Sequence, residues 1–193
     1  MNRLTALWVA SAGLLTVALV VGQIRAAVDG EANEGINKVA DLLEKGDTAA
    51  ATKAAHAVAE KNELDIIMSA FALRKKKGIG IGPTANAITP DGVELKIEAI
   101  ARDGITPDAL KKEGAALART GFVMSAVGHV ALAKSPAKDV GKQKKADFVK
   151  WAQDLTKAGG EFSVAAKGGS AAEVKKAANK VKQNCDSCHA VFK

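Results

Sequence analysis

The sequence predicts an all-α fold, an up-down four-helix bundle with an extra N-terminal helical segment and a long glycine-rich connection. Three observations indicate this fold class. The chain is rich in alanine and lysine, it contains no tyrosine, and it shows little of the alternation of β-branched residues that strands display. The segment from residue 28 to residue 193 is enough chain for one domain.

The first 27 residues predict an export segment, either a cleaved signal peptide or a retained signal anchor. Arg3 precedes an uncharged apolar run over 4–21, which is long for a cleaved signal and short for a membrane span. Ala26 and Ala27 supply small residues at which cleavage can occur. In both cases we expect residues 28–193 to be periplasmic, tethered to the membrane if the segment stays uncleaved.

Apolar spacing and capping residues predict the helices of the body in order. Residues 31–44 place apolar side chains at helical spacing. A second helix, capped by Asp47 or Thr48, runs to Arg74. A glycine-rich connection follows, with a short helix within it. Three longer helices, each with its own start signal, are predicted over 106–134, 135–167 and 170–192.

The end of the chain contains a Cys-x-x-Cys-His motif, from Cys185 to His189. This spacing is the attachment signature of a c-type haem, in which two thiols add to the haem vinyl groups and the imidazole ligates the iron. On a helix, Cys185 and Cys188 are i and i+3 neighbours on one face. They are also the only two cysteines of the sequence, so no other sulfur competes for this role.

Two other chemistries use closely spaced cysteines and remain as alternatives. A redox-active disulfide of the thioredoxin type lies at a helix N-terminus, where the helix dipole lowers the pKa of the attacking thiol, whereas this pair is near a predicted helix end. A structural zinc site needs four ligands. The motif supplies three, and only His56 and His129 stand elsewhere. The motif and the export segment together favour haem attachment.

With this motif at the end of a helical chain, the sequence resembles the class II cytochromes c, the family of cytochrome c′ and its low-spin relatives. The similarity is strongest over residues 106–193. It includes an aromatic and a basic residue three and four positions after the haem histidine. The resemblance implies an exported four-helix bundle with one covalent haem c. It also implies roles for five residues: the thioether anchors Cys185 and Cys188, the proximal iron ligand His189, and Phe192 and Lys193 near the haem.

The resemblance does not supply the sixth iron ligand. Low-spin members use a methionine near the start of their first bundle helix, and none stands there in this sequence. His129 lies about 8 Å from the haem end of its predicted helix, on a mostly apolar stripe. It is the candidate ligand, with a core or pocket-lining histidine that makes one hydrogen bond as the alternative. Met124 is a weaker candidate, and Met68, about 30 Å from the haem end, is excluded. His56 is expected at the surface.

Two functions fit these predictions. The first is electron transfer by a single haem, with periplasmic or membrane redox proteins as partners. The second is binding of a small gas, nitric oxide or carbon monoxide, at a five-coordinate iron, as in cytochrome c′. We do not expect an enzyme, because a peroxidase needs distal acid–base groups and no arginine stands near His129 in the sequence.

The charge of the chain bears on its partners. Lys and Arg number 28 against 21 Asp and Glu, a net charge of +7. The lysines are spread along predicted helices and are not clustered with aromatic residues, so we expect no nucleic-acid partner. Basic patches around the haem edge would instead select the redox partner. A homodimer is a further expectation, since helix-bundle relatives often dimerise through their first helices.

Overall fold

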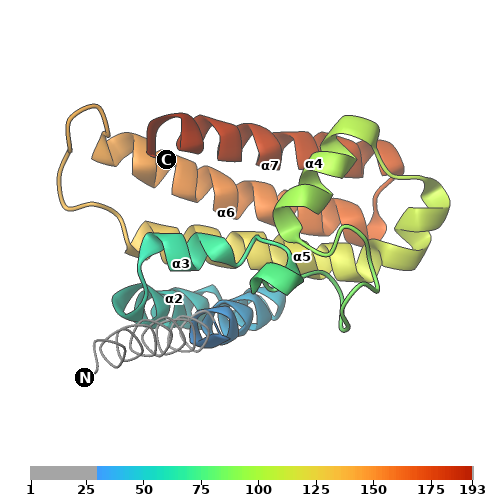
Figure 1. Cartoon of the computed structure of the whole chain (residues 1–193), viewed down its shortest axis with the longest axis horizontal. Helices are drawn as coiled ribbons and strands as arrows, with labels where there is room; N and C mark the ends of the chain where they lie inside the picture. Colours follow the sequence, from blue (N-terminus) through green and yellow to red (C-terminus); the bar gives the residue numbers. More distant parts are fainter. Residues whose placement is uncertain (1–29, 193) are drawn as a thin grey trace, which may run out of the picture.

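The structure is a computed structural model that describes residues 30–192, and these residues form a helical bundle (Figure 1). The all-α fold class predicted from the sequence is confirmed. The predicted export segment, residues 1–27, and Lys193 lie outside the described residues.

Three long helices form the centre of the bundle. They are α5 (Pro107–Ala133), α6 (Lys145–Gly168) and α7 (Ala171–Phe192). α5 begins where the sequence predicted, because the Thr106 side chain accepts a hydrogen bond from the N–H of Ala109 and a proline holds the first helical position. Before α7, Ser170 and Glu173 form the predicted capping box. α5 is long and apolar enough to cross a membrane, but 67% of that stretch is buried, as in a central core helix.

The predicted start of the fourth helix at Ser135 is wrong, because α6 begins only after a loop over 134–144. The Asp139 carboxylate accepts a hydrogen bond of 2.9 Å from the first N–H of α6. Val140 and Gln143 exchange two backbone hydrogen bonds of 2.9 Å. The segment contains few apolar residues, so a helix there would have had little surface to bury against the bundle.

Glycines allow α5 and α6 to pack backbone against backbone. Gly114, Gly121 and Gly128 recur seven residues apart along α5, and this spacing keeps them on one face. A Cβ at Gly121 would lie 2.6 Å from the carbonyl oxygen of Gly159, and one at Gly128 would lie 2.7 Å from the amide nitrogen of Thr156. No larger residue fits at these positions while the helices keep this spacing.

The second helix is shorter than predicted. α2 (Thr48–Lys61) ends at Asn62, whose backbone is extended and whose buried side chain donates a hydrogen bond to the carbonyl oxygen of Val58. Such a side chain competes with the hydrogen bonds of the helix itself. The expected continuation to Arg74 is therefore wrong. The chain turns instead into α3 (Leu64–Ser69) and the short 3₁₀ helix η1 (Arg74–Lys76).

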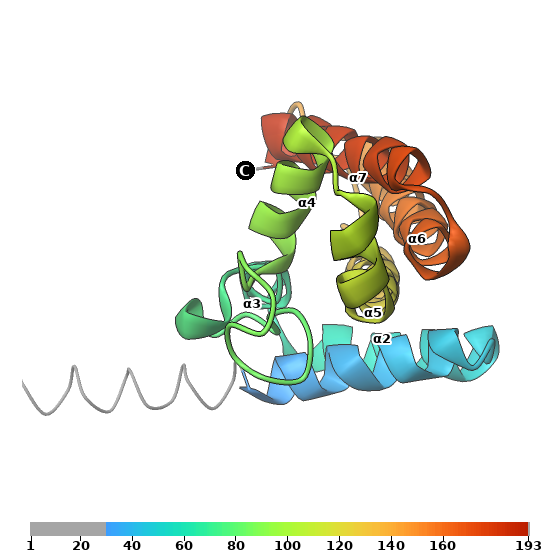
Figure 2. The same cartoon turned by 90° about the vertical axis from the view of Figure 1, so that its right-hand side faces the viewer.

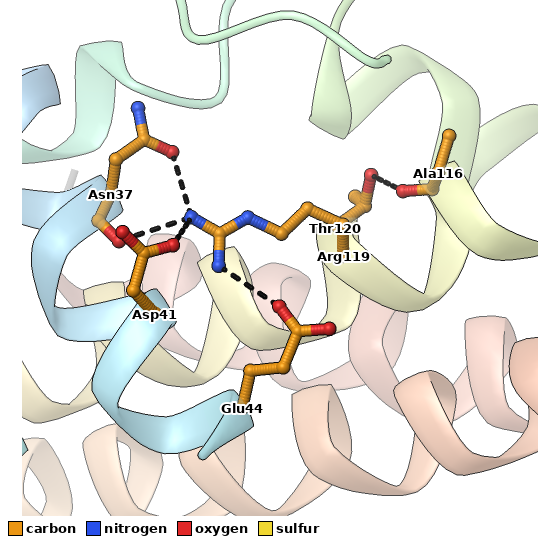
Figure 3. A network of polar contacts seen from close by, with 6 residues as sticks. All are labelled: Asn37, Asp41, Glu44, Ala116, Arg119 and Thr120. Atoms are coloured by element: carbon orange, nitrogen blue, oxygen red, sulfur yellow. Dashed lines mark hydrogen bonds and ion pairs between the residues drawn. The ribbon is translucent and has the colours of Figure 1, made fainter. Parts of the chain in front are cut away.

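An N-terminal helix, described over residues 30–44, pairs with α2, and the two cross beneath the three long helices (Figure 2). Arg119 of α5 holds this helix (Figure 3). Its guanidinium lies 2.7 Å from the Asp41 carboxylate, 3.0 Å from the Asn37 carbonyl oxygen and 3.4 Å from the Glu44 carboxylate. The predicted first helix is thus confirmed, and Arg119 ties it to α5.

The glycine-rich connection is organised around the buried carboxylate of Asp91. It accepts hydrogen bonds from Nε of Arg74 at 2.9 Å, and from the N–H groups of Ile81 at 2.7 Å and Asn86 at 3.0 Å. Burial alone would raise the pKa of Asp91, but these donors outweigh burial and hold the pKa below its usual value. The connection leads into α4 (Val93–Asp103), the predicted short helix, which packs on α7.

Two neighbouring glycines of α6 test the backbone contact. A Cβ at Gly159 would lie 2.6 Å from the amide nitrogen of Ser125, whereas one at Gly160 would meet only the Ser125 hydroxyl at 3.8 Å. We expect Gly159→Ala to lower the free energy of unfolding by about 1–3 kcal/mol through overpacking. Gly160→Ala should raise it by up to about 1 kcal/mol through helix propensity. Urea unfolding of both variants measures the difference, and equal effects would contradict the contact.

Candidate haem-binding site

A cavity of about 560 Å³ opens beside the C-terminal half of α7. A volume of this size is typical of sites for small molecules and cofactors. Its wall is mostly apolar and is formed by side chains from α3, α4, α5, α6 and α7. The residues that define its chemistry are Met68, Glu94, Glu98, Met124, Phe148, Trp151, Cys185, Cys188, His189 and Phe192.

The structure brings the Cys-x-x-Cys-His residues to one wall of this cavity, on the last turns of α7. Because the helix is continuous there, the two cysteines lie one turn apart and His189 lies one turn beyond Cys185. At this level, α7 is joined to α6 by a hydrogen bond of 3.0 Å from the Asn184 side chain to the Trp151 carbonyl oxygen. The predicted anchors and the predicted iron ligand therefore line one compartment.

The surroundings of the two free cysteines favour the protonated thiol. Burial, with smaller contributions from Glu94 and Asp186, raises the pKa of Cys185 from its ordinary value of 9.0 to about 11. Burial raises the pKa of Cys188 as well. A thiol that attacks disulfides has a lowered pKa, so the site does not support the thioredoxin-type alternative.

The zinc alternative has no support from the structure either. Among residues 30–192, no three or more side chains of His, Cys, Asp and Glu converge in an arrangement that could hold a metal ion. His56, one of the two histidines outside the motif, is exposed on α2, as the sequence predicted. The other, His129, is not among the residues that line the cavity.

Phe192 closes one end of the cavity together with two aromatic residues of α6. Its ring lies edge-on to Phe148 and to Trp151, with centroid separations of 5.2 and 5.7 Å. Edge-to-face pairs at these distances are favourable, and they hold the last turn of α7 against α6. The structure thus places Phe192 in the wall beside the motif.

The structure does not bring His129 to the cavity, contrary to its expected role as the sixth ligand. Met124 and Ala131 line the wall from α5, and their spacing of one heptad places them on one helix face. His129 lies about 140° around the helix from Met124. It is half-buried, and burial lowers its pKa. This placement fits the alternative, a packing histidine.

Two methionines line the wall where His129 was expected. Met124 is only 1% exposed, and Met68 packs against the apolar cluster that includes Phe148 and Phe192. The exclusion of Met68 is wrong, because it assumed an unbroken second helix. The break at Asn62 lets α3 approach the end of α7 instead. The sequence-based prediction missed this break, which the Asn62 side chain marks by its hydrogen bond to Val58.

Carboxylates line the part of the cavity that α4 borders. Glu94 and Glu98 lie one turn apart on α4, and Asp186 lies on α7. Lys182 pairs with Asp186 at 2.5 Å. This hydrogen bond, with a smaller contribution from Glu98, raises the pKa of Lys182. Negative charge therefore outweighs positive charge on this flank of the cavity.

These features fit a covalently held haem. The cavity has the volume of a cofactor site, its wall is mostly apolar, and two protonated thiols stand one turn apart with a histidine directly after them. A helical bundle with such a site defines the class of c-type haem proteins.

Comparison with known proteins gives a family match over the C-terminal part of the chain. The family model described as Cytochrome C′ matches residues 103–193. This match to a family whose members carry covalently bound haem c confirms the resemblance seen in the sequence over these residues. No curated protein and no solved structure shows a significant match to the chain.

Part of the cavity wall lies outside the family match. The matched residues contain α5, α6 and α7, whereas α3 and α4 precede them in the chain. Met68, Glu94 and Glu98 come from these earlier helices. One side of the site is therefore built from segments that the family model does not describe.

Replacing both cysteines tests the attachment chemistry. With Cys185→Ala and Cys188→Ala combined, neither thioether can form, so we expect acidified acetone to extract any bound haem. Haem staining after denaturing electrophoresis should then be lost completely. His56→Ala, at an exposed position, is the control and should keep the covalent haem of the wild type. Covalent haem in the double variant would contradict the assignment.

Proposed function

We propose that the protein is an exported carrier of single electrons with one covalently attached haem c, and not an enzyme. The observation that carries this proposal is that two methionines, Met68 and Met124, line the same cavity as His189. Histidine and methionine together are the axial ligands of electron-transferring cytochromes c, and they raise the reduction potential. Export is consistent with the family, whose members are typically exported.

Different residues of the cavity have different roles in holding the cofactor. Cys185 and Cys188 would attach it through thioethers, and His189 would ligate its iron. Phe192 and Trp151 exclude water from the end of the cavity at which α7 terminates. The bound haem supplies reversible one-electron chemistry. A rigid apolar wall supports such chemistry, because little structure has to rearrange when the charge changes.

Met68 is the methionine that we assign as the sixth ligand. It lies on α3 and packs in the same apolar cluster as Phe192, three residues after His189. Met124 is buried in the main core, whereas Met68 packs against both that core and the cluster that includes Phe192. Met68 is half-buried, so its flexible side chain can adjust with a smaller loss of core packing.

Gas binding is the second candidate, favoured by the apolar character of the remaining wall. Phe71, Ile97 and Leu155 line the cavity from the turn after α3, from α4 and from α6. His129 does not line the cavity, so it would not ligate the iron of a haem held there. If neither methionine ligates, a neutral diatomic molecule such as nitric oxide or carbon monoxide would meet an apolar pocket.

Optical spectra of the holoprotein separate the two functions. We expect low-spin haem in the oxidised and reduced states and no shift when carbon monoxide is added to the reduced protein. Fixed ligands on both sides of the iron would explain this result. A high-spin spectrum that shifts with carbon monoxide would overturn the electron-carrier proposal in favour of gas binding.

Single methionine substitutions then identify the ligand. We expect Met68→Leu to convert the spectrum from low-spin to high-spin, because leucine preserves volume but cannot ligate iron. Met124→Leu is the matched control and should leave the spin state unchanged. The opposite pattern would assign Met124. A low-spin spectrum in both variants would refute methionine ligation, and His129→Ala would then test the remaining candidate.

A further inference from the structure

The loop over 134–144 lies at the end of the bundle where α7 also ends (Figure 1). The Gln143 side chain donates a hydrogen bond of 3.2 Å to the carbonyl oxygen of Val191. Just after the loop, Phe148 packs edge-on against Phe192 with a centroid separation of 5.2 Å. The loop is therefore attached to the helical turn that follows the haem motif.

This loop and the residue after it are strongly basic. Residues 134–145 contain five lysines against one aspartate, a net charge of +4. Lys138, Lys142, Lys144 and Lys145 are all exposed. Lys144 pairs with an aspartate of the loop, but Lys138 and Lys142 have no ion-pair partner within the part of the chain that the structure describes. Their charge remains available to an external partner.

An apolar residue stands among these lysines. Val140 is 59% exposed at the turn that its hydrogen bonds with Gln143 close. An apolar centre with a polar rim is the usual anatomy of a protein–protein interface. One loop offers a small area, as in transient redox encounters, whose interfaces fall below about 1,200 Å². Segments that bind membrane surfaces present a larger apolar face, often with Trp, Phe or Leu, and this loop has none of these.

The charge on the other flank of the cavity favours approach at the loop. Glu94 and Glu98 of α4, with Asp186 of α7, outnumber the single lysine on that flank, Lys182. An acidic surface is repelled there and attracted to the loop, and such asymmetry orients a partner during diffusional encounter.

We propose that the basic loop, residues 134–145, is the docking surface for an acidic redox protein. This proposal rests on the proposed electron-carrier function, and the chemistry of the loop defines the partner. The partner is a one-electron protein that presents Asp and Glu side chains around a small apolar contact. One electron passes between the two proteins in each encounter, so that one is oxidised as the other is reduced.

A charge-reversal pair tests the proposal on the holoprotein. Lys138→Glu with Lys142→Glu changes the loop. Lys111→Glu with Lys112→Glu changes two exposed lysines near the start of α5, about 30 Å away along that helix. Both variants alter the net charge equally. The probe is a gold electrode coated with a carboxylate-terminated monolayer, and cyclic voltammetry measures the rate of interfacial electron transfer.

We expect the loop variant to lose at least about tenfold in rate at low salt, while the α5 variant stays close to the wild type. The difference should shrink at 1 M salt, where the Debye length is about 3 Å. Equal rates in all three proteins, or equal losses in both variants, would overturn the loop as the docking surface.

Two controls separate this proposal from other readings. Reduction by ascorbate and oxidation by ferricyanide in solution test redox cycling itself, so a wild type that fails to cycle refutes the electron-carrier function and not the docking surface alone. Co-sedimentation with vesicles of anionic phospholipid tests a membrane target. If the loop variant loses vesicle binding but keeps the electrode rate, the loop binds membranes and the protein-partner proposal is wrong.

Discussion

The direct contact between the backbones of α5 and α6 sets the geometry on which the rest of the packing depends. Gly121 and Gly159 leave no side chain between these helices. Nearer the start of α6, Phe148 and Trp151 meet the end of α7, where they pack against Phe192. The haem motif is therefore supported by a pair of helices whose separation cannot easily change.

Features that depend on local sequence were predictable. The caps at Thr106 and Ser170 satisfy backbone groups within their own turns, so the starts of α5 and α7 follow from a few residues each. The haem motif is also a local pattern. Cys185, Cys188 and His189 share a helical face in any bundle that keeps the last helix intact, which is why their shared placement required no knowledge of the tertiary structure.

Placement across helices could not be predicted in this way. Met68 was excluded by its rise along an assumed unbroken helix, and the end of α2 at Asn62 instead places it in the cavity wall. His129 was favoured by rise and by an apolar stripe, but the face of α5 that lines the cavity is that of Met124. An asparagine can stay exposed within a helix or end it from a buried position, and only the packing around it decides between these outcomes. The late start of α6 has a similar cause, because Asp139 supplies an acceptor for a helix that begins farther along the chain.

The carboxylate of Asp91 fixes the glycine-rich connection and, through it, the position of α4 beside the cavity. A long connection without regular structure loses much conformational entropy on folding, and here three donors from separate points of the chain converge on one side chain. α4 begins just after Asp91. The positions of Glu94 and Glu98 at the cavity therefore depend on Asp91, which does not itself line the cavity. Substitutions in the glycine-rich connection would therefore change the electrostatic potential at the cavity by moving Glu94 and Glu98, while the haem-attachment motif stays unchanged.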